Sequence, residues 1–201
     1  MMVGIIDYGV GNLFSLCSSF RAIGQEAVVS GDPDVLHKAD RLVLPGVGAF
    51  ADAAEKLRKS GLDGFVKDQA AAGVPLLGIC LGMQLLFEKS LEYGEHPGLG
   101  LLAGQVVPME GRLPKGLKIP HMGWNRLAVQ QGRLLEGMTG RYVYFVHSYF
   151  AADCPGSVSA VTDYGIPITA AVEQGNVMGC QFHPEKSGPV GLEILTRFCK
   201  M

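Results

Sequence analysis

Hydrophobic residues in the first half of the chain fall into short continuous runs, which alternate with longer segments of helical periodicity. The short runs, typical of strands buried on both faces, lie at residues 3–6, 41–44 and 75–79. Between them, apolar residues recur at helical spacing over 13–23 and 50–72. This alternation predicts an α/β fold with a mostly parallel central sheet flanked by helices.

In the second half, the predicted strands follow one another without long helical segments between them. They lie at 105–108, 142–150, 157–162, 168–173 and 177–182. Such close spacing favours hairpins, so we expect an antiparallel extension of the sheet. A Ser-Gly-Pro sequence at 187–189 then predicts a closing helix that runs to about Cys199. No repeat or linker is visible, and we expect one domain over residues 1–201.

Composition and net charge indicate which classes of molecule the chain binds. The chain has 201 residues, of which 48% are hydrophobic and 18% charged, enough for a substantial core. A formal net charge of −2 provides no broad positive field for a phosphate backbone. We therefore expect metabolites or proteins as partners, and neither nucleic acid nor a membrane.

Cysteine usage and the start of the chain indicate the compartment. The five cysteines form no Cys-x-x-Cys pair, and an odd number suits a reducing environment better than a disulfide framework. Residues 1–7 contain no basic leader, and no later apolar run reaches membrane length. We expect a cytoplasmic protein that is neither secreted nor inserted into a membrane.

The most informative stretch is an apolar strand that passes through Gly-x-Cys-x-Gly into a predicted amphipathic helix. Cys80 lies at its centre, with Gly78 and Gly82 two positions to either side. This is the cysteine form of a nucleophile elbow, a sharp strand-to-helix turn whose glycines permit close approach. The amino end of the following helix favours a thiolate. The alternative, a buried structural cysteine, leaves the symmetric glycines unexplained.

A second motif, His183-Pro184-Glu185, ends the last predicted strand. Residues i and i+2 of an extended chain face the same way, so Glu185 can hold one ring nitrogen of His183 while the other faces a nucleophile. Pro184 stiffens the link and biases His183 towards an extended conformation. A surface turn is the alternative for this motif alone. Together with Cys80, it predicts a Cys-His-Glu triad.

A strand that ends in Pro-Gly-Val-Gly, at 45–48, supplies the remaining part of an acyl-transfer site. Acyl transfer needs backbone donors aimed at the developing oxyanion, and flanking glycines let a peptide turn its N–H into a site. The amide of Leu81, directly after the nucleophile, is one candidate donor, and that of Val47 or Gly48 is the other. An ordinary glycine turn is the alternative.

The histidines outside these motifs suggest no further chemistry. We expect His37, His96 and His121 to be ordinary surface or loop residues. No histidines or cysteines have a metal-ligand spacing such as His-x-x-x-His or Cys-x-x-Cys. We therefore expect neither a bound metal nor a cofactor.

In this order, the three motifs resemble those of the class I, or triad, glutamine amidotransferases, whose glutaminase core carries Pro-Gly-x-Gly, Gly-x-Cys-x-Gly-x-Gln and His-Pro-Glu. Within that superfamily, the chain is most similar to the glutaminase subunits of imidazole glycerol phosphate synthases. The stretches that carry this second resemblance span nearly the whole chain and lie at residues 6–12, 45–50, 119–125 and 144–149. The resemblance implies a flavodoxin-like core and hydrolysis of L-glutamine to glutamate and ammonia.

The resemblance also implies four substrate-binding residues. Gln84, one helical turn past Cys80, and Glu92 resemble the side chains that hold glutamine. A carboxylate suits the substrate's ammonium group, and amide donors suit its carboxylate. The backbone of Ser148 and Tyr149 matches the remaining contact. For Gln84 alone, a helix-surface position is the alternative.

Released ammonia must be protected from protonation, so a glutaminase of this kind needs a dedicated partner. The resemblance implies a heterodimer with a (β/α)8 cyclase, in which ammonia converts the phosphoribulosyl aminoimidazole intermediate PRFAR to imidazole glycerol phosphate and AICAR in histidine biosynthesis. Asn12, Trp124, Tyr144 and Lys186 match interface or gate positions. For Trp124, an exposed interface anchor and a core position are both open.

Three other functions compete with this interpretation. A glutaminase of another pathway is disfavoured by the Asp-Tyr-Gly-Val-Gly-Asn start and the His-Met-Gly-Trp-Asn segment. A DJ-1-like stress protein or a cysteine peptidase is not expected to combine Gln84 and Glu92 with His-Pro-Glu. A regulatory subunit without activity is disfavoured by the intact triad.

Overall fold

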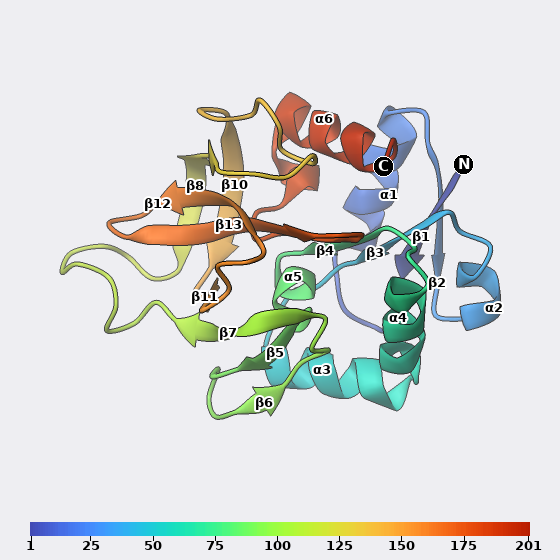
Figure 1. Ribbon diagram of the computed structural model, residues 1–201, viewed down its shortest axis with the longest axis horizontal. Helices are drawn as coiled ribbons and strands as arrows, with labels where there is room; N and C mark the ends of the chain where they lie inside the picture. Colours follow the sequence, from blue (N-terminus) through green and yellow to red (C-terminus); the bar gives the residue numbers. More distant parts are fainter.

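The computed structural model describes residues 1–201 and is built around a central sheet of eight strands (Figure 1). Their order is β2-β1-β3-β4-β14-β13-β12-β9, in which the first five strands are parallel and the last three continue the sheet in antiparallel fashion. The parallel strands are β1 (Met2–Ile6), β2 (Glu26–Ser30), β3 (Arg41–Leu44), β4 (Leu76–Ile79) and β14 (Val177–Cys180). The antiparallel ones are β9 (Ala128–Val129), β12 (Val158–Asp163) and β13 (Pro167–Gln174). The predicted α/β fold with an antiparallel extension is confirmed.

Helices cover both faces of the sheet, because its parallel strands are apolar on both sides. On one face lie α1 (Leu13–Ala22) and α6 (Gly188–Phe198), and on the other lie α3 (Phe50–Lys59), α4 (Leu62–Ala71) and α5 (Leu81–Leu85) (Figure 1). Two large apolar clusters, one on each face, form the core. The short helix α2 (Pro33–Leu36) links β2 to β3.

Two smaller sheets flank the central one. The first has the order β11-β7-β5-β6 and packs on the side of α3 and α4; its strands are β5 (Phe87–Ser90), β6 (His96–Pro97), β7 (Leu102–Pro108) and β11 (Tyr149–Ala152). The second pairs β8 (His121–Arg126) with β10 (Tyr142–His147) on the side of α1 and α6. A short 3-10 helix, η1 (Pro184–Lys186), precedes α6.

Three predicted elements differ from the structure. The single helix expected over 50–72 is divided at Gly61, whose φ of 73° is a left-handed conformation that ends α3 before α4 begins. The strand expected over 142–150 is divided at Ser148 into β10 and β11, which belong to different sheets. The helix after Cys80 is not amphipathic, because all five residues of α5 are buried.

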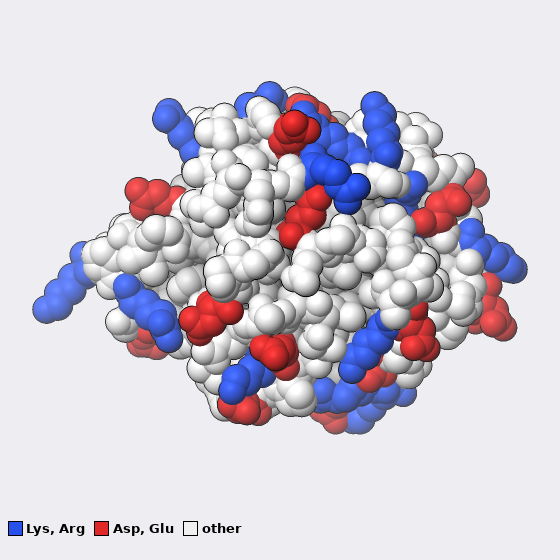
Figure 2. Space-filling view, in the orientation of Figure 1, with Lys and Arg blue, Asp and Glu red and all other residues white.

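None of the helices combines the length and the apolar character that a membrane span requires. Figure 2 shows Lys and Arg interspersed with Asp and Glu around one face, with few charged side chains in its middle. That face shows no broad patch of positive charge.

Candidate functional site

Three neighbouring parallel strands end at the same edge of the sheet, and each carries one of the predicted motifs. β3, β4 and β14 lie side by side, with Leu44 paired to Gly78 and Ile79 paired to Cys180. The Pro-Gly-Val-Gly loop at 45–48 follows β3, Cys80 follows β4, and His183 follows β14. The carboxyl ends of parallel strands form the usual ligand-binding edge of an open α/β sheet, so the motifs converge there because of their strand order.

Cys80 occupies the sharp turn that the sequence predicted. Its φ of 56° and ψ of −112° lie in a region that side chains rarely adopt, and the residue is 7% exposed. The flanking glycines explain how the turn fits. A Cβ on Gly78 would lie 2.7 Å from backbone atoms of Met83, and one on Gly82 would collide with the carbonyl oxygen of Leu44. The elbow therefore requires glycine at both positions.

The predicted oxyanion donors surround this turn. The amides of Leu81, Val47 and Gly48 make no hydrogen bond within the chain. Gly46 lies directly against the elbow, since a Cβ there would be 2.6 Å from the backbone nitrogen of Gly82. Gly48 has a φ of 90°, a conformation natural only for glycine. The loop thus approaches the turn at Cys80 closely and keeps unpaired N–H groups near it.

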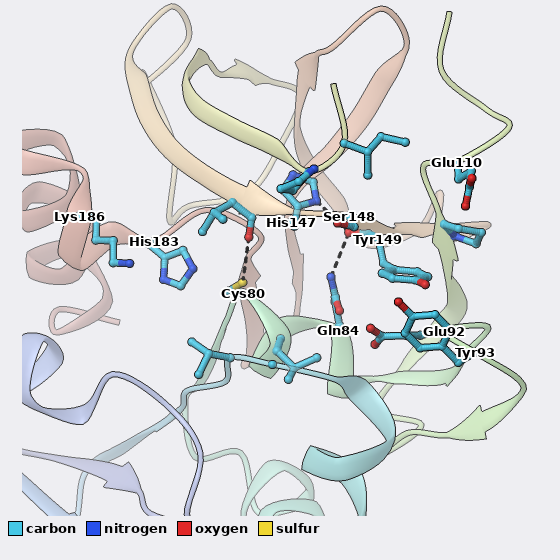
Figure 3. A pocket seen from close by; sticks show the side chains of 17 residues that line it. Cys80, Gln84, Glu92, Tyr93, Glu110, His147, Ser148, Tyr149, His183 and Lys186 are labelled. Atoms are coloured by element: carbon cyan, nitrogen blue, oxygen red, sulfur yellow. Dashed lines mark hydrogen bonds between the residues drawn. The ribbon is translucent and has the colours of Figure 1, made fainter. Parts of the chain in front are cut away.

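His183 and Glu185 form a buried pair, as their spacing predicted. The ring nitrogen Nδ1 lies 2.7 Å from Glu185 Oε1, and the two side chains are 3% and 2% exposed. Nε2 has no hydrogen-bond partner, and the ring faces Cys80 in Figure 3. Burial lowers the pKa of His183, but the Cys80 sulfur and the Glu185 carboxylate outweigh burial and raise that pKa to about 9. The imidazole is therefore charged at neutral pH.

Two hydrogen bonds fix the ends of the 45–48 loop. The Tyr8 hydroxyl donates to the carbonyl oxygen of Pro45 at 2.7 Å. At the other end, the Phe50 amide, the first of α3, donates to Glu92 Oε2 at 2.7 Å. Burial and the Cys80 sulfur both raise the pKa of Tyr8, so its hydroxyl remains a proton donor. Between these anchors, the backbone groups of Gly46, Val47 and Gly48 make no hydrogen bond within the chain.

A cavity of about 510 Å³ opens beside Cys80 and is lined by the residues predicted to bind substrate. Figure 3 shows Gln84 between Cys80 and Glu92, with Glu92 at the end of the cavity away from His183. The predicted site residues along its wall are Val47, Gly48, Cys80, Leu81, Gln84, Glu92, Ser148, Tyr149, His183 and Lys186. The structure therefore brings the catalytic, oxyanion and substrate-binding candidates together.

Gln84 contributes a different group from the one expected. Its Nε2 donates to the carbonyl oxygen of Tyr149 at 3.1 Å and to Gln181 Oε1 at 2.9 Å, so both amide hydrogens are engaged. Gln84 therefore offers the cavity an acceptor, Oε1, rather than a donor. Gln181 is a site residue that sequence reasoning missed. The signal was its place two residues before His183, on the same side of an extended chain.

The prediction for His121 was wrong, because this residue is 1% exposed and lies in the interior on β8. Its Nδ1 is 3.0 Å from His147 Nε2, and His147 Nδ1 is 2.8 Å from the carbonyl oxygen of Tyr149. Burial lowers the pKa of His121 to about 4 and that of His147 to about 3. Both rings are neutral at pH 7 and support the Tyr149 backbone at the cavity wall. His37 is exposed, as predicted, and His96 is half-buried on β6.

Of the candidate interface residues, only Lys186 lines the cavity. Trp124 is 51% exposed, so its side chain is not part of the core. It packs edge-on against Tyr144, with ring centroids 5.9 Å apart, and Lys186 Nζ lies 5.9 Å from the centre of the same Tyr144 ring. Asn12 caps α1, which packs against η1 and α6. No group of three or more His, Cys, Asp or Glu side chains is placed to hold a metal ion.

Comparison with known proteins agrees with this architecture. Residues 4–201 match the family model "Glutamine amidotransferase class-I". The chain belongs to the class I glutamine amidotransferases. A crystal structure described as a glutamine amidotransferase shares the fold, with a TM-score of 0.77 at 23% identity over 98% of each chain.

Curated relatives define the branch of the family. The "Imidazole glycerol phosphate synthase subunit HisH" of Bacillus velezensis is 50% identical over 100% of this chain and 96% of its own length. The protein of the same name from Wolinella succinogenes is 50% identical over the full length of both. Within the class I family, this chain belongs with the HisH subunits of imidazole glycerol phosphate synthase.

Proposed function

We propose that this chain hydrolyses L-glutamine to glutamate and ammonia and delivers the ammonia to the cyclase subunit of an imidazole glycerol phosphate synthase. The observation that carries the proposal is the geometry at one sheet edge, where Cys80 and the buried His183–Glu185 pair meet beside a cavity. The HisH name of relatives at 50% identity supports the choice of pathway.

The first half of the reaction forms a glutamyl thioester. The Cys80 thiolate attacks the side-chain carbonyl carbon of glutamine, and the amides of Leu81 and Val47 or Gly48 stabilise the resulting oxyanion. His183, charged at neutral pH because of its raised pKa, gives its Nε2 proton to the departing nitrogen. The C–N bond breaks as ammonia leaves, and Glu185 keeps the ring in place through Nδ1.

The second half releases glutamate. Neutral His183 takes a proton from water, the hydroxide attacks the thioester carbon, and the C–S bond breaks to regenerate the thiolate and the imidazolium. Every proton is thus returned, and the chain needs no cofactor for this chemistry. The oxyanion amides act in both halves, because each passes through a tetrahedral intermediate.

The cavity suits free glutamine. One carboxylate oxygen of Glu92 accepts a hydrogen bond from the Phe50 amide, and the other can accept one from the substrate's ammonium group. Gln84 Oε1 accepts from a substrate N–H, and the backbone of Ser148 and Tyr149 contacts the rest of the amino-acid moiety. Cys80 and Glu92 lie towards opposite ends of the cavity, as an extended glutamine requires (Figure 3).

A partner surface follows from the need to deliver ammonia before it is protonated. We infer a heterodimer with a (β/α)8 cyclase that converts PRFAR to imidazole glycerol phosphate and AICAR. Asn12, Trp124, Tyr144 and Lys186 are the proposed interface and gate residues. β8 supports this choice, since Met122 and Trp124 on its outer face are 60% and 51% exposed. Residues 1–201 then act as one amidotransferase domain, in the cytoplasm where this biosynthesis takes place.

Regulation belongs to the same proposal. The loop is anchored by Tyr8 and Glu92, while its Val47 peptide is free to rotate between two glycines. We infer that the Val47 amide turns into the site when the cyclase holds its substrate, with Asn12, Trp124 and Lys186 carrying the signal.

Covalent trapping tests the proposed function. A diazoketone analogue of glutamine should alkylate one cysteine, Cys80, in the complex, and peptide mass spectrometry locates the adduct. Excess glutamine should prevent labelling, whereas excess asparagine should not. Labelling of Cys17, the half-buried cysteine, at the same rate or a lack of protection by glutamine would contradict the assignment.

A further inference from the structure

Gln181 lies between the nucleophile and a substrate-facing residue, with both ends of its side-chain amide engaged. We propose that Gln181 is a positioning residue of the site, whose amide holds the Cys80 sulfur and the Gln84 side chain in a fixed relation. The inference rests on the proposed glutaminase function, because it names a residue that supports that chemistry without touching the substrate.

The position of Gln181 is set by the central sheet. It follows the last residue of β14 directly, and its backbone amide donates to the carbonyl oxygen of Ala170 at 2.9 Å. β14 runs parallel to β4, so residues past the end of β14 lie beside the elbow. Gln181 is 0% exposed. A buried amide of this kind must find its partners within the protein.

Both partners belong to the site. Gln181 Nε2 lies 3.8 Å from Cys80 Sγ and donates towards it. Gln181 Oε1 accepts from Gln84 Nε2 at 2.9 Å, and Gln84 Nε2 also donates to the carbonyl oxygen of Tyr149 at 3.1 Å. A continuous path of hydrogen bonds therefore connects the sulfur with the backbone at the cavity wall, through two buried amides.

The sulfur needs this donor once it is ionised. Its other hydrogen-bond contact is the carbonyl oxygen of Val146 at 4.0 Å, which can accept from a thiol but only repels a thiolate. His183 gives its proton away during the reaction, whereas the Gln181 amide keeps its hydrogens at every pH. Gln181 therefore stabilises the thiolate and fixes the direction of Cys80 in both halves of the cycle.

Two variants distinguish the effect of the Gln181 donor group from that of its acceptor group. Gln181→Glu keeps an acceptor for Gln84 but replaces the donor by a carboxylate next to the sulfur. Gln181→Leu has similar size and removes both hydrogen bonds. Gln130→Glu is the matched control, because Gln130 is exposed and its side chain makes no hydrogen bond within the chain. All three are measured in the complex with the cyclase.

Gln181→Glu should lower kcat for glutamine hydrolysis by about 10- to 100-fold, the effect of one hydrogen bond to a charged group, and leave KM within about threefold. Iodoacetamide should alkylate Cys80 half-maximally at a higher pH in this variant, since the added charge opposes ionisation. Gln181→Leu should also lower kcat and should raise KM, because Gln84 loses a partner. Gln130→Glu should behave as the parent chain does in every assay.

Two results would overturn the inference. An unchanged alkylation profile and kcat in both variants would show that the amide does not act on the sulfur. If thermal stability and ammonium-dependent synthesis were both lost while the alkylation profile stayed unchanged, the role of Gln181 would be purely structural. Absence of glutaminase activity in the parent complex would instead refute the proposed function, and the alkylation profiles would still decide whether Gln181 acts on Cys80.

Discussion

Replacement of Glu185 by glutamine should separate the role of the carboxylate from that of the nucleophile. The change keeps the shape of the side chain and a carbonyl acceptor for His183 Nδ1, but it removes the charge. His183 Nδ1 and Glu185 Oε1 lie 2.7 Å apart, and the two side chains are 3% and 2% exposed. Water therefore cannot substitute for the lost interaction. A hydrogen bond between charged groups contributes about 1.5 to 3 kcal/mol, and this converts to a loss of about 10- to 150-fold in kcat.

The pH profile should move as well. Burial lowers the pKa of His183, and without the Glu185 charge only the Cys80 sulfur raises it. The pKa of His183 is therefore lower in the variant, and less imidazolium is present at neutral pH. The alkaline limb of kcat, expected near pH 9 in the parent chain, should shift to lower pH in Glu185→Gln.

The assay is glutamate formation by the complex with the cyclase ligand bound, between pH 6 and pH 10. Cys80→Ala serves as the inactive reference, and ammonium-dependent synthesis serves as the control for an intact complex. The reasoning is refuted if Glu185→Gln is as inert as Cys80→Ala, which would make the carboxylate indispensable, or if its kcat and pH profile equal those of the parent.

Three further predictions concern the loop and the buried histidines. Tyr8→Phe leaves the Pro45 carbonyl without its donor, so denaturant unfolding should show a loss of about 1 to 3 kcal/mol, together with slower glutamine hydrolysis; unchanged stability would contradict the anchor. His147 has a pKa lowered to about 3, whereas an unfolded histidine titrates near 6.5. The unfolded state therefore binds the proton first. As the pH is lowered below about 6.5, this residue should reduce the free energy of unfolding by about 1.4 kcal/mol per pH unit. His147→Asn should lose that part of the slope, and an identical slope would count against the assignment. If Val47 turns inwards only in the liganded complex, the isolated chain should hydrolyse glutamine about 10²- to 10³-fold more slowly than that complex, and equal rates would show a preformed oxyanion site.

Much of the fold and site could be predicted because the relevant patterns are local. The apolar run that forms β4 and the glycines around Cys80 lie within a few residues, and each has a direct steric reason. The His183–Glu185 contact was also predicted from local spacing, but its geometry differs from the expected extended chain, because His183 is extended and Glu185 lies in the 3-10 helix η1 that follows it.

Other elements were missed because their patterns are weak or inverted. β2 is an edge strand, and most of its residues are only half-buried, so its apolar signal is short. β8 has its large apolar residues, Met122 and Trp124, on the exposed face and His121 inside. A lone histidine is usually expected at the surface, but His121 is buried because its ring stacks against Phe145 of β10 and against Tyr164.

Long-range contacts were beyond the sequence patterns. The bonds from Tyr8 to Pro45 and from Phe50 to Glu92 join segments 37 and 42 residues apart. Gln84 and Gln181 are 97 residues apart and meet because α5 follows β4 while Gln181 follows its neighbour β14. Such contacts depend on strand order, which periodicity alone does not specify.

The most direct test of the glutaminase assignment is the activity of a Cys80→Ala complex with its cyclase subunit, supplied in turn with glutamine and with an ammonium salt at alkaline pH. We predict that synthesis from glutamine is abolished while synthesis from ammonium proceeds at the rate of the parent complex, because only the source of ammonia is lost. Full glutamine-dependent synthesis in Cys80→Ala, or loss of both activities in a complex that still assembles, would contradict the account.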